Sequence, residues 1–445
     1  MLQPVIFLPG IMGSVLKLKD AVIWPGTPLS VLLPYNLMSE LMRPDLRATE
    51  VWRSLGPLGI YDSILRDLEN WGFVTDQLLF PFPYDWRKSN RDAAGTLADL
   101  IDTVAARDQD NTKITLLAHS MGGLVARYYL ESGKFAGRPG FGKVRSLITM
   151  GTPHRGAPLA LTAGIGKEKR VFLSASQVLQ LASSPLFPAV YELLPPVGEP
   201  FLWDVVDKLN PRDVYSKEIS TAPGGLNLSA ENLQAAITFR EGLDFSRKPS
   251  AVRYFCFFGT DHPTPNYLEL REGARFLVRA ITVDGAGDGT VPIWSGQPNG
   301  VQSVPVPGEH SKLFCSSALR NILAELLGAP RLLAAAAAPT ELSLSPKVVE
   351  PGDPIHVTLL LPGTAATIQG AITIYRLEVD GSGAETAENE FGKPISVEYA
   401  GGNAEALTIT FDAPNLKGYY RARFRGANME PSEDEFVVQD PEIKL

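Results

Sequence analysis

A single serine lies where a predicted strand gives way to a predicted helix. The apolar run 114–117 is followed by Ala-His-Ser-Met-Gly-Gly at 118–123, and a helical pattern begins at Leu124. Small residues around a serine at such a turn are typical of a nucleophile elbow, which lifts the serine hydroxyl out of the sheet. Ser120 is therefore a candidate nucleophile. An ordinary glycine-rich loop is the alternative interpretation.

A nucleophilic serine needs a base, and the base needs an acid that orients it. In α/β-hydrolases these groups follow in the order serine, acid, histidine, each after a later strand. His310 follows the alternating run 301–306 and opens a helical pattern over 312–327. Asp288 precedes it between two glycines, which let a carboxylate turn inward. We predict Ser120 as the nucleophile, His310 as the general base and acid, and Asp288 as the orienting acid.

Other residues are weaker candidates for the acid and the base. Asp284 lies in the same glycine-rich loop as Asp288 and is the alternative acid. His262 follows an apolar run, but no acid stands between it and a later strand. His356 belongs to a separate, strand-rich C-terminal segment. For His154, which follows the predicted strand 144–150, we favour a packing role over a catalytic one.

An oxyanion hole requires backbone N–H groups aimed at the point where the carbonyl oxygen becomes negative. One donor is the residue after the nucleophile, Met121, and the other comes from a loop after an early strand. Residues 5–8 form a predicted strand, and Pro-Gly-Ile-Met-Gly-Ser follows at 9–14. We predict the Ile11 N–H as the second donor, with Met12 as the neighbouring alternative. A simple Pro-Gly turn is the other interpretation.

Several short motifs occur in a characteristic order over about residues 1–328. They are FLPGIMGS at 7–14, PYDWR at 83–87, AHSMGG at 118–123, GTDHPT at 259–264, GDGTV at 287–291 and His310. In these motifs the chain resembles the lecithin:cholesterol acyltransferase family of α/β-hydrolases, which includes lysosomal phospholipase A2. PYDWR is the most specific motif, because generic lipases lack it. The resemblance implies activity on acyl esters of lipids, as a phospholipase or an acyltransferase, without a cofactor.

The PYDWR block also has a physical interpretation of its own. It follows an apolar stretch, 78–82, so we expect it at the carboxyl edge of the sheet, near the serine. Asp85 and Arg87 can brace a rim through a charge-assisted hydrogen bond, and Trp86 can provide an apolar wall for substrate. A structural corner without substrate contact is the alternative.

Composition and charge narrow the class of protein. The chain has 445 residues with 41 basic and 49 acidic side chains, which gives a net charge of −8. From Glu341 onward there are 17 acidic and 8 basic residues, so the acidity is concentrated in the C-terminal part. No long Lys/Arg run supports nucleic-acid binding. The remaining histidines lack metal-ligand spacing, and we predict no metal site.

The two cysteines and the start of the chain bear on its compartment. Cys256 lies in an apolar run, where a buried free thiol is the usual state. The chain enters its first predicted strand without a charged leader, and no stretch of about 18 apolar residues occurs. These features predict a cytoplasmic protein.

The positions of glycine- and proline-rich stretches between predicted elements indicate two domains. We expect an α/β-hydrolase domain over 1–330, with helices near 61–71 and 92–106 and with cap or lid insertions at 20–55 and 157–250. An Ala-rich linker is predicted at 331–339. Beyond it, seven short alternating strands predict a small immunoglobulin-like β-sandwich over 340–445, at 342–344, 356–361, 371–378, 395–398, 406–411, 419–424 and 435–438.

The predicted function is a serine hydrolase that acts on lipid acyl esters, as a phospholipase A does, through an acyl-Ser120 intermediate. The alternatives are an acyltransferase that moves the acyl chain to an alcohol, and a small-ester or thioester hydrolase. From another class, the chain is an effector that partners recruit through the acidic β-sandwich. The expected partners are a lipid or other acyl ester, a membrane surface contacted by the cap, and a protein docked on the acidic C-terminal domain.

Overall fold

The computed structural model describes residues 2–107, 112–207, 209–273, 275–329, 340–427 and 429–440, without the side chains of 362–364 and 405. The predicted linker 331–339 lies outside the described residues. Within them, no helix is long and apolar enough to cross a membrane.

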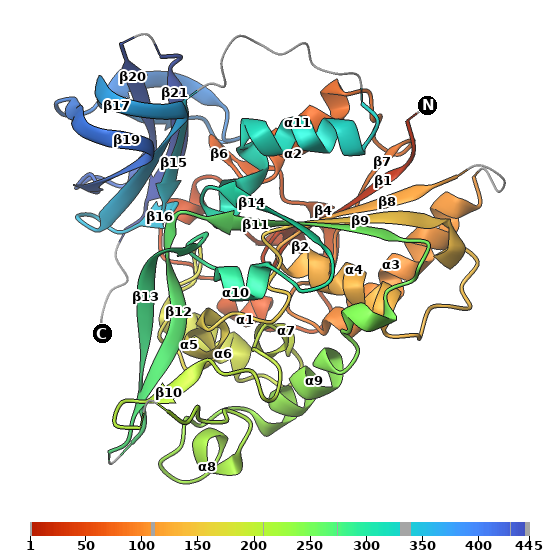
Figure 1. Ribbon diagram of the computed structural model, residues 1–445. Helices are drawn as coiled ribbons and strands as arrows, with labels where there is room; N and C mark the ends of the chain where they lie inside the picture. The colour runs from red at the N-terminus through yellow and green to blue at the C-terminus, as the bar shows by residue number, and fades with distance from the viewer. Residues whose placement is uncertain are drawn as a thin grey trace.

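A six-stranded parallel sheet forms the centre of the N-terminal part (Figure 1). Its order is β14-β11-β9-β8-β1-β7, and each strand pairs with its neighbours in parallel. Its strands are β1 (Val5–Leu8), β7 (Leu79–Pro81), β8 (Ile114–His119), β9 (Val144–Met150), β11 (Arg253–Thr260) and β14 (Gln302–Pro307). The predicted strands 5–8 and 144–150 agree with β1 and β9 at both ends.

Helices cover both faces of this sheet. Successive side chains of a strand point to opposite faces, so Val5 and Phe7 enter one apolar core and Ile6 and Leu8 enter the other. The first core is completed by α2 (Asp62–Asn70) and α11 (Ser317–Leu326), and the second by α3 (Asn90–Ala105) and α4 (Met121–Glu131). Figure 1 shows these two pairs on opposite sides of the sheet. The helix predicted over 312–327 is divided into the 3₁₀ turn η4 (His310–Cys315) and α11.

The segment between β1 and α2 adds two small sheets beside the central one. β2 pairs with both β3 and β4, and β5 pairs with β6. The elements of this segment are β2 (Ser14–Leu18), β3 (Ala21–Trp24), η1 (Ser30–Leu32), α1 (Met38–Leu41), β4 (Arg47–Val51), β5 (Ser54–Leu55) and β6 (Leu58–Gly59). Elsewhere, η2 (Phe141–Lys143) precedes β9.

The regular elements of the segment between β9 and β11 are mostly short helices, and the segment contributes to a separate apolar core. Its elements are α5 (Leu159–Gly164), α6 (Ala175–Ala182), α7 (Ala189–Glu192), β10 (Leu202–Asp204), α8 (Lys217–Ser220), α9 (Ala230–Arg240) and η3 (Phe245–Arg247). A long hairpin that the sequence analysis did not predict, β12 (His262–Arg271) and β13 (Leu277–Gly287), joins β10 in a three-stranded sheet. A short helix, α10 (Ile293–Gly296), follows the hairpin.

The regular elements of the C-terminal part are all strands among the described residues, and we call residues 340–440 the β region. Its strands are β15 (Glu341–Ser345), β16 (Val348–Val349), β17 (Pro354–Val379), β18 (Glu385–Glu390), β19 (Ile395–Asp412), β20 (Gly418–Gly426) and β21 (Ser432–Val438). All pairings are antiparallel except β16 with β21. The fold class predicted from the sequence is confirmed, as a parallel α/β sheet followed by antiparallel β-structure.

The division of the β region into strands was predicted incorrectly, although seven strands were predicted and seven occur among the described residues. The predicted strands 356–361 and 371–378 both belong to β17, and 395–398 and 406–411 both belong to β19. The residues between them contain glycine, proline and small side chains, which we interpreted as turns. In the structure β17 and β19 pair with each other through this stretch, with irregular register near Ala365. Tertiary pairing therefore overrides the local turn signals.

Candidate functional site

Ser120 lies at a sharp turn between β8 and α4, at the carboxyl edge of the central sheet. Its backbone φ is 53°, a left-handed value that is uncommon for a residue with a side chain. The helix begins at Met121 and not at Leu124, so the turn is tighter than predicted. A Cβ atom on Gly122 would lie 2.5 Å from the carbonyl oxygen of Pro9. Only glycine fits at this close approach of α4 to the loop after β1.

The structure brings the three predicted triad residues together. The imidazole Nε2 of His310 lies 2.9 Å from Ser120 Oγ, and its Nδ1 lies 2.8 Å from Asp288 Oδ2. Asp288 is fully buried, and its Oδ1 accepts the N–H groups of Thr290 (3.0 Å) and Val291 (2.7 Å). The serine hydroxyl, a histidine and a buried carboxylate are thus connected by consecutive hydrogen bonds, which is the geometry of an activated serine.

Asp288 reaches the site by a different route from the one the sequence suggested. We expected the acid directly after a strand of the main sheet, but Asp288 follows β13, which belongs to the three-stranded sheet. The hairpin begins after β11 and returns the chain to the end of that strand. A Cβ atom on Gly259 of β11 would collide with the Asp288 side chain. The carboxylate therefore lies at the carboxyl edge of the central sheet after a detour of 27 residues from Asp261 to Gly287.

Opposing effects set the pKa of His310. Burial lowers the pKa of its imidazole, but the charge of Asp288 and the hydrogen bond to it raise the pKa, with a net result above the ordinary value of 6.5. A general base must be neutral, and its neutral fraction falls when the pH drops through the pKa. We therefore expect kcat/KM to fall on the acid side with a midpoint above pH 6.5. A pH–rate profile with a soluble ester measures this acid-side midpoint. A midpoint below pH 6 would contradict the role of His310 as the general base.

His119 and Tyr61 form a buried network beneath the triad that the sequence analysis missed. His119 Nε2 lies 3.0 Å from the carbonyl oxygen of His310, and its Nδ1 lies 2.7 Å from the Tyr61 hydroxyl. Burial lowers the pKa of His119 to about 3, so the ring is neutral. Its Nε2–H then donates to His310, and Tyr61 donates to Nδ1 while accepting the Gly10 N–H at 2.8 Å. The network links the loop after β1 to the turn that carries His310.

Replacing Tyr61 by phenylalanine tests this network. The change leaves the Gly10 N–H and His119 Nδ1 without their partner, and an unsatisfied buried polar group costs about 1–3 kcal/mol. We expect a lower melting temperature and a kcat reduced by about tenfold, since a loss of roughly 1.4 kcal/mol in the transition state is tenfold in rate. Thermal unfolding and ester kinetics measure both. Wild-type kcat with a lowered melting temperature would mean that the network only stabilises the fold.

The two predicted oxyanion donors come from the start of α4 and from the turn after β1. Met121 is the first residue of α4, where backbone N–H groups have no partner within the helix. Ile11 lies in the turn after β1 and lines the same cavity as Ser120. Among the described residues, its N–H makes no hydrogen bond to the protein. Met12 has a φ of 63° and its carbonyl oxygen accepts from the Trp24 indole at 2.9 Å, which fixes the turn. Ile11 and Met121 remain the predicted donors.

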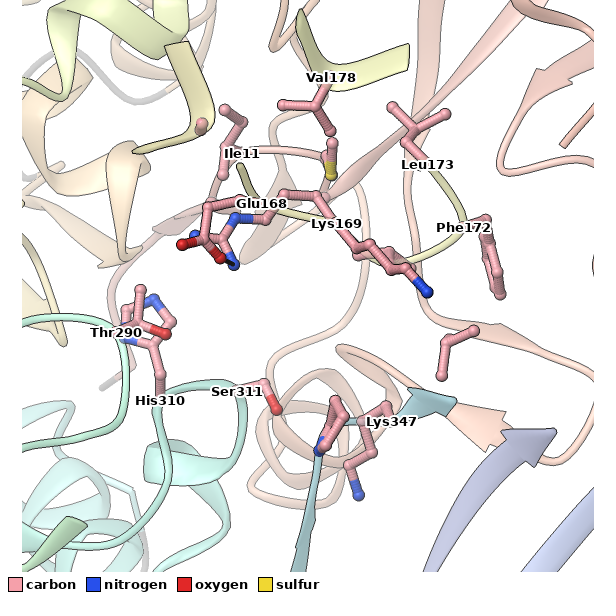
Figure 2. Close-up of a pocket in the computed structure, with 18 of the residues that line it drawn as sticks. Ile11, Glu168, Lys169, Phe172, Leu173, Val178, Thr290, His310, Ser311 and Lys347 are labelled. Carbon is pink, nitrogen blue, oxygen red and sulfur yellow. Dashed lines mark ion pairs between the residues drawn. The ribbon is translucent and has the colours of Figure 1, made fainter. Parts of the chain in front are cut away.

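Ser120 and His310 line a cavity of about 610 Å³, and Figure 2 shows His310 among the residues that line it. One side is apolar and comes from the loop after β1, the segment 34–60 and helices α5 to α7. The apolar lining includes Met12, Tyr35, Trp52, Trp86, Leu159, Phe172, Leu173, Val178, Leu181 and Phe187. Charged residues of the 165–174 loop and of the β region also line the cavity, and Lys169 of the loop pairs with Glu350; we call this part the polar end of the cavity. In Figure 2, Val178 and Leu173 lie on the opposite side of the cavity from Lys347.

The three residues predicted as a substrate rim differ in their exposure to the cavity. Arg87 and Asp85 form a two-point ion pair at 2.8 and 2.7 Å, and Arg87 also donates to the carbonyl oxygens of Leu41 and Arg43. Trp86 and Arg87 line the cavity, whereas Asp85 is not among its lining residues. The pair therefore fixes the segment around 41–43 behind the wall. Substrate contact by Trp86 remains a prediction.

The alternative candidates lie outside the hydrogen-bonded triad. Asp284 is exposed, and His356 is on β17, where its ring bonds Thr410. His154 is buried with its Nε2 at 3.3 Å from Thr149, which agrees with a packing role. His262 is buried near Asp288, but its Nε2 has no hydrogen-bond partner among the described residues.

Replacing His262 by alanine distinguishes the two possible bases. Because His310 alone contacts Ser120 Oγ, we expect the variant to keep a kcat of the same order as the wild type. His310→Ala should lose nearly all turnover. Ester kinetics on the two purified variants, with circular dichroism to check folding, give the answer. The reverse order would transfer the role of base to His262.

No group of His, Cys, Asp and Glu side chains within the described ranges has the arrangement of a metal site. Cys256 is a buried free thiol, as predicted, and Cys315 is half-buried and also free.

Comparisons with known proteins show which family the chain is similar to. The family model described as lecithin:cholesterol acyltransferase matches residues 42–245. The Arabidopsis thaliana protein named lecithin-cholesterol acyltransferase-like 4 is 26% identical over 398 residues, covering 69% of this chain and 72% of that protein. The dog protein named lysosomal phospholipase A and acyltransferase is 23% identical over 291 residues, with 61% of this chain and 67% of that protein covered.

A solved structure supports the fold alone. The crystal structure described as the Tle4–Tli4 complex has a TM-score of 0.54 and 15% identity, and the match covers 73% of this chain and 97% of that chain. The chain is thus similar to the lecithin:cholesterol acyltransferase family over residues 42–245, and its relatives carry names from that family.

Proposed function

We propose that this protein is a serine hydrolase that cleaves acyl esters of lipids, with phospholipase A-type activity. The observation that carries the proposal is the Ser120–His310–Asp288 hydrogen-bonded chain at the floor of a largely apolar cavity. The names of the relatives support a lipid ester as substrate, since they include a phospholipase A(1) and a phosphatidylcholine-sterol acyltransferase.

In the proposed mechanism, His310 Nε2 accepts the proton of Ser120 Oγ as the oxygen attacks the ester carbonyl. The buried Asp288 carboxylate holds Nδ1–H and stabilises the imidazolium that forms. The N–H groups of Met121 and Ile11 stabilise the negative oxygen of the tetrahedral intermediate. His310 then gives the proton to the leaving alcohol, and an acyl-Ser120 ester remains. Water, activated by His310, releases the fatty acid.

We propose that residues 20–55 and 157–250 act as a cap that holds the acyl chain. Both segments contribute apolar side chains to the cavity wall, including Tyr35, Trp52, Phe172 and Leu181. A saturated chain gains about 0.8 kcal/mol for each methylene group that such a wall removes from water. The apolar surface of the cap supports a long acyl chain over a small ester.

Acyl transfer to an alcohol is the second candidate, and the same acyl-Ser120 intermediate serves both reactions. The outcome depends on whether water or an alcohol reaches the intermediate. The relatives include proteins named for acyl transfer, which favours keeping this candidate.

The test is to incubate the purified wild type and Ser120→Ala with phosphatidylcholine liposomes, with and without a long-chain alcohol, and to identify products by mass spectrometry. Fatty acid and lysolipid from the wild type alone support the proposal. A new ester that depends on the alcohol would establish acyl transfer. Cleavage of p-nitrophenyl esters without any lipid product would reject the lipid substrate and keep the serine hydrolase.

A further inference from the structure

The β region forms part of the wall of the catalytic cavity. Residues 345–350 and 439–440 line the same cavity as Ser120 and His310. In β16 the two side chains point in opposite directions. Val349 belongs to the core of the β region, whereas Val348 packs against the core of the α/β part and faces the cavity. The β region therefore contributes directly to the cavity that contains Ser120 and His310.

Buried charges fix this wall to the turn that carries His310. Asp434 of β21 is 2% exposed and binds Lys347, and its other oxygen lies 2.9 Å from the amino group of Lys312. Lys312 is two residues after His310 in η4. Glu341 of the β region also accepts the N–H of Ser317, at the start of α11, at 2.6 Å. The wall and the histidine turn thus form one connected structure.

A second wall of the polar end comes from the 165–174 loop, which connects α5 to α6. Lys169 of this loop forms an ion pair with Glu350, so the loop and the β region are in contact. Glu168, Lys169 and Arg170 all line the cavity. Figure 2 shows Glu168 and Lys169 extending in different directions from this loop, with Lys347 across the cavity.

Arg170 differs from the other cations at this end of the cavity. Lys169 pairs with Glu350, and Lys347 shares the Asp434 carboxylate with Lys312. The guanidinium of Arg170 has a single ionic contact, with Glu168 at 3.7 Å, and its side chain donates no hydrogen bond to any described residue. Its charge is near enough to His310 to lower the pKa of the imidazole. The cavity therefore contains a guanidinium that has Glu168 at 3.7 Å but makes no hydrogen bond to a described residue.

We propose that Arg170 and the β-region wall around Val348 form a subsite for the phosphodiester of the leaving alcohol. This inference rests on the proposed function, because it assigns the polar end of a phospholipid to the polar end of the cavity. A guanidinium binds phosphate oxygens through two parallel N–H···O bonds, and these charge-assisted bonds are stronger than neutral ones. The apolar cap then holds the acyl chain on the other side of Ser120. The β region thereby helps to determine which leaving alcohols of lipid esters fit into the cavity.

Binding of glycerophosphocholine, the soluble headgroup fragment, tests the subsite without any turnover. Phosphorus NMR titration of the full-length protein gives its Kd. We expect Arg170→Gln to weaken binding by at least about tenfold, since hydrogen bonds to charged groups contribute roughly 1.5–3 kcal/mol. Val348→Trp should also weaken this binding, because the larger side chain narrows the subsite on the side that the β region forms. Leu416→Trp is the matched control, at an exposed residue of the β region that does not line the cavity, and it should bind as the wild type does.

Inorganic phosphate is titrated in parallel, and two outcomes would overturn the subsite. Equal binding of glycerophosphocholine by Arg170→Gln and the wild type would do so, and so would binding of inorganic phosphate as tight as that of the headgroup fragment. Circular dichroism excludes misfolding as the cause of weak binding.

A kinetic experiment distinguishes a failure of the subsite from a failure of the proposed function. The ratio of kcat/KM for phosphatidylcholine to that for diacylglycerol with the same chains, in the same mixed micelles, should fall at least about tenfold in Arg170→Gln. An unchanged ratio, with both lipids cleaved, rejects the subsite alone. If the wild type cleaves neither lipid but binds glycerophosphocholine through Arg170, the proposed lipase activity fails and the subsite stands.

Discussion

Replacing Ser120 by alanine is expected to abolish turnover of every ester substrate while the fold persists. The hydroxyl is the only group in the cavity within hydrogen-bond distance of His310 Nε2 among the described residues, and no other nucleophile is placed to form the acyl intermediate. Loss of the serine in another triad enzyme costs about 10⁶ in kcat, and we expect an effect of this size. The alanine side chain fits the elbow, because it only removes an oxygen.

Ser311→Ala is the matched control for this experiment. Ser311 is adjacent to His310 and also lines the cavity, but its hydroxyl donates to Glu309 at 2.6 Å and does not contact the triad. It should keep turnover of the same order as the wild type. Fluorophosphonate labelling followed by intact-mass measurement should modify the wild type and Ser311→Ala only. Residual turnover of Ser120→Ala well above background would refute Ser120 as the nucleophile.

The second large effect is expected from Asp288→Asn, which should lower kcat by up to about 10⁴. An asparagine at this position can present its N–H₂ to His310, which favours the wrong tautomer and removes the charge that stabilises the imidazolium. The carboxylate is fully buried and bonds two backbone N–H groups, so some stability is lost as well. Steady-state kinetics with a thermal unfolding curve separate the two effects.

Asp284→Asn provides the control, since this residue precedes Asp288 by four positions and is exposed. It should change kcat only slightly. The pH profile adds a second criterion, because Asp288 raises the pKa of His310 and burial lowers it. In Asp288→Asn, the acid-side midpoint of the remaining activity should therefore move to lower pH. A larger loss in Asp284→Asn than in Asp288→Asn would exchange the roles of the two aspartates.

Much of the site could be predicted because its chemistry depends on local sequence. The elbow needs small residues on both sides of Ser120, and Gly122 leaves no room for a side chain beside Pro9. The apolar run of β9 and the alternation of β14 indicate strands without any tertiary information. The order of Ser120, Asp288 and His310 then follows a known chain order. Their catalytic roles remain predictions that the two substitutions above test.

Other features depend on contacts between distant parts of the chain and have no local signal. Tyr61 could not be predicted as a link between Gly10 and His119, because a tyrosine near a helix start has no distinctive spacing. Asp288 was predicted from its glycines, but its path through β12 and β13 was not. The strands of the β region were divided at glycine and proline, since turn propensity is local while strand pairing is not.

What the sequence determined by itself is the parallel α/β fold, the β-structure of the C-terminal part, and the residue types and order of the triad, because periodicity and short motifs encode these. The tertiary structure alone decided that the β region adjoins the cavity and that Arg170 lines it, with Glu168 at 3.7 Å as its one ionic contact among the described residues. The physical reason is that this wall of the cavity is formed by segments more than 170 residues apart in the sequence. Lys169 and Glu350, which form an ion pair, belong to two such segments. Their proximity is a result of packing, and neither segment has a pattern that indicates the other.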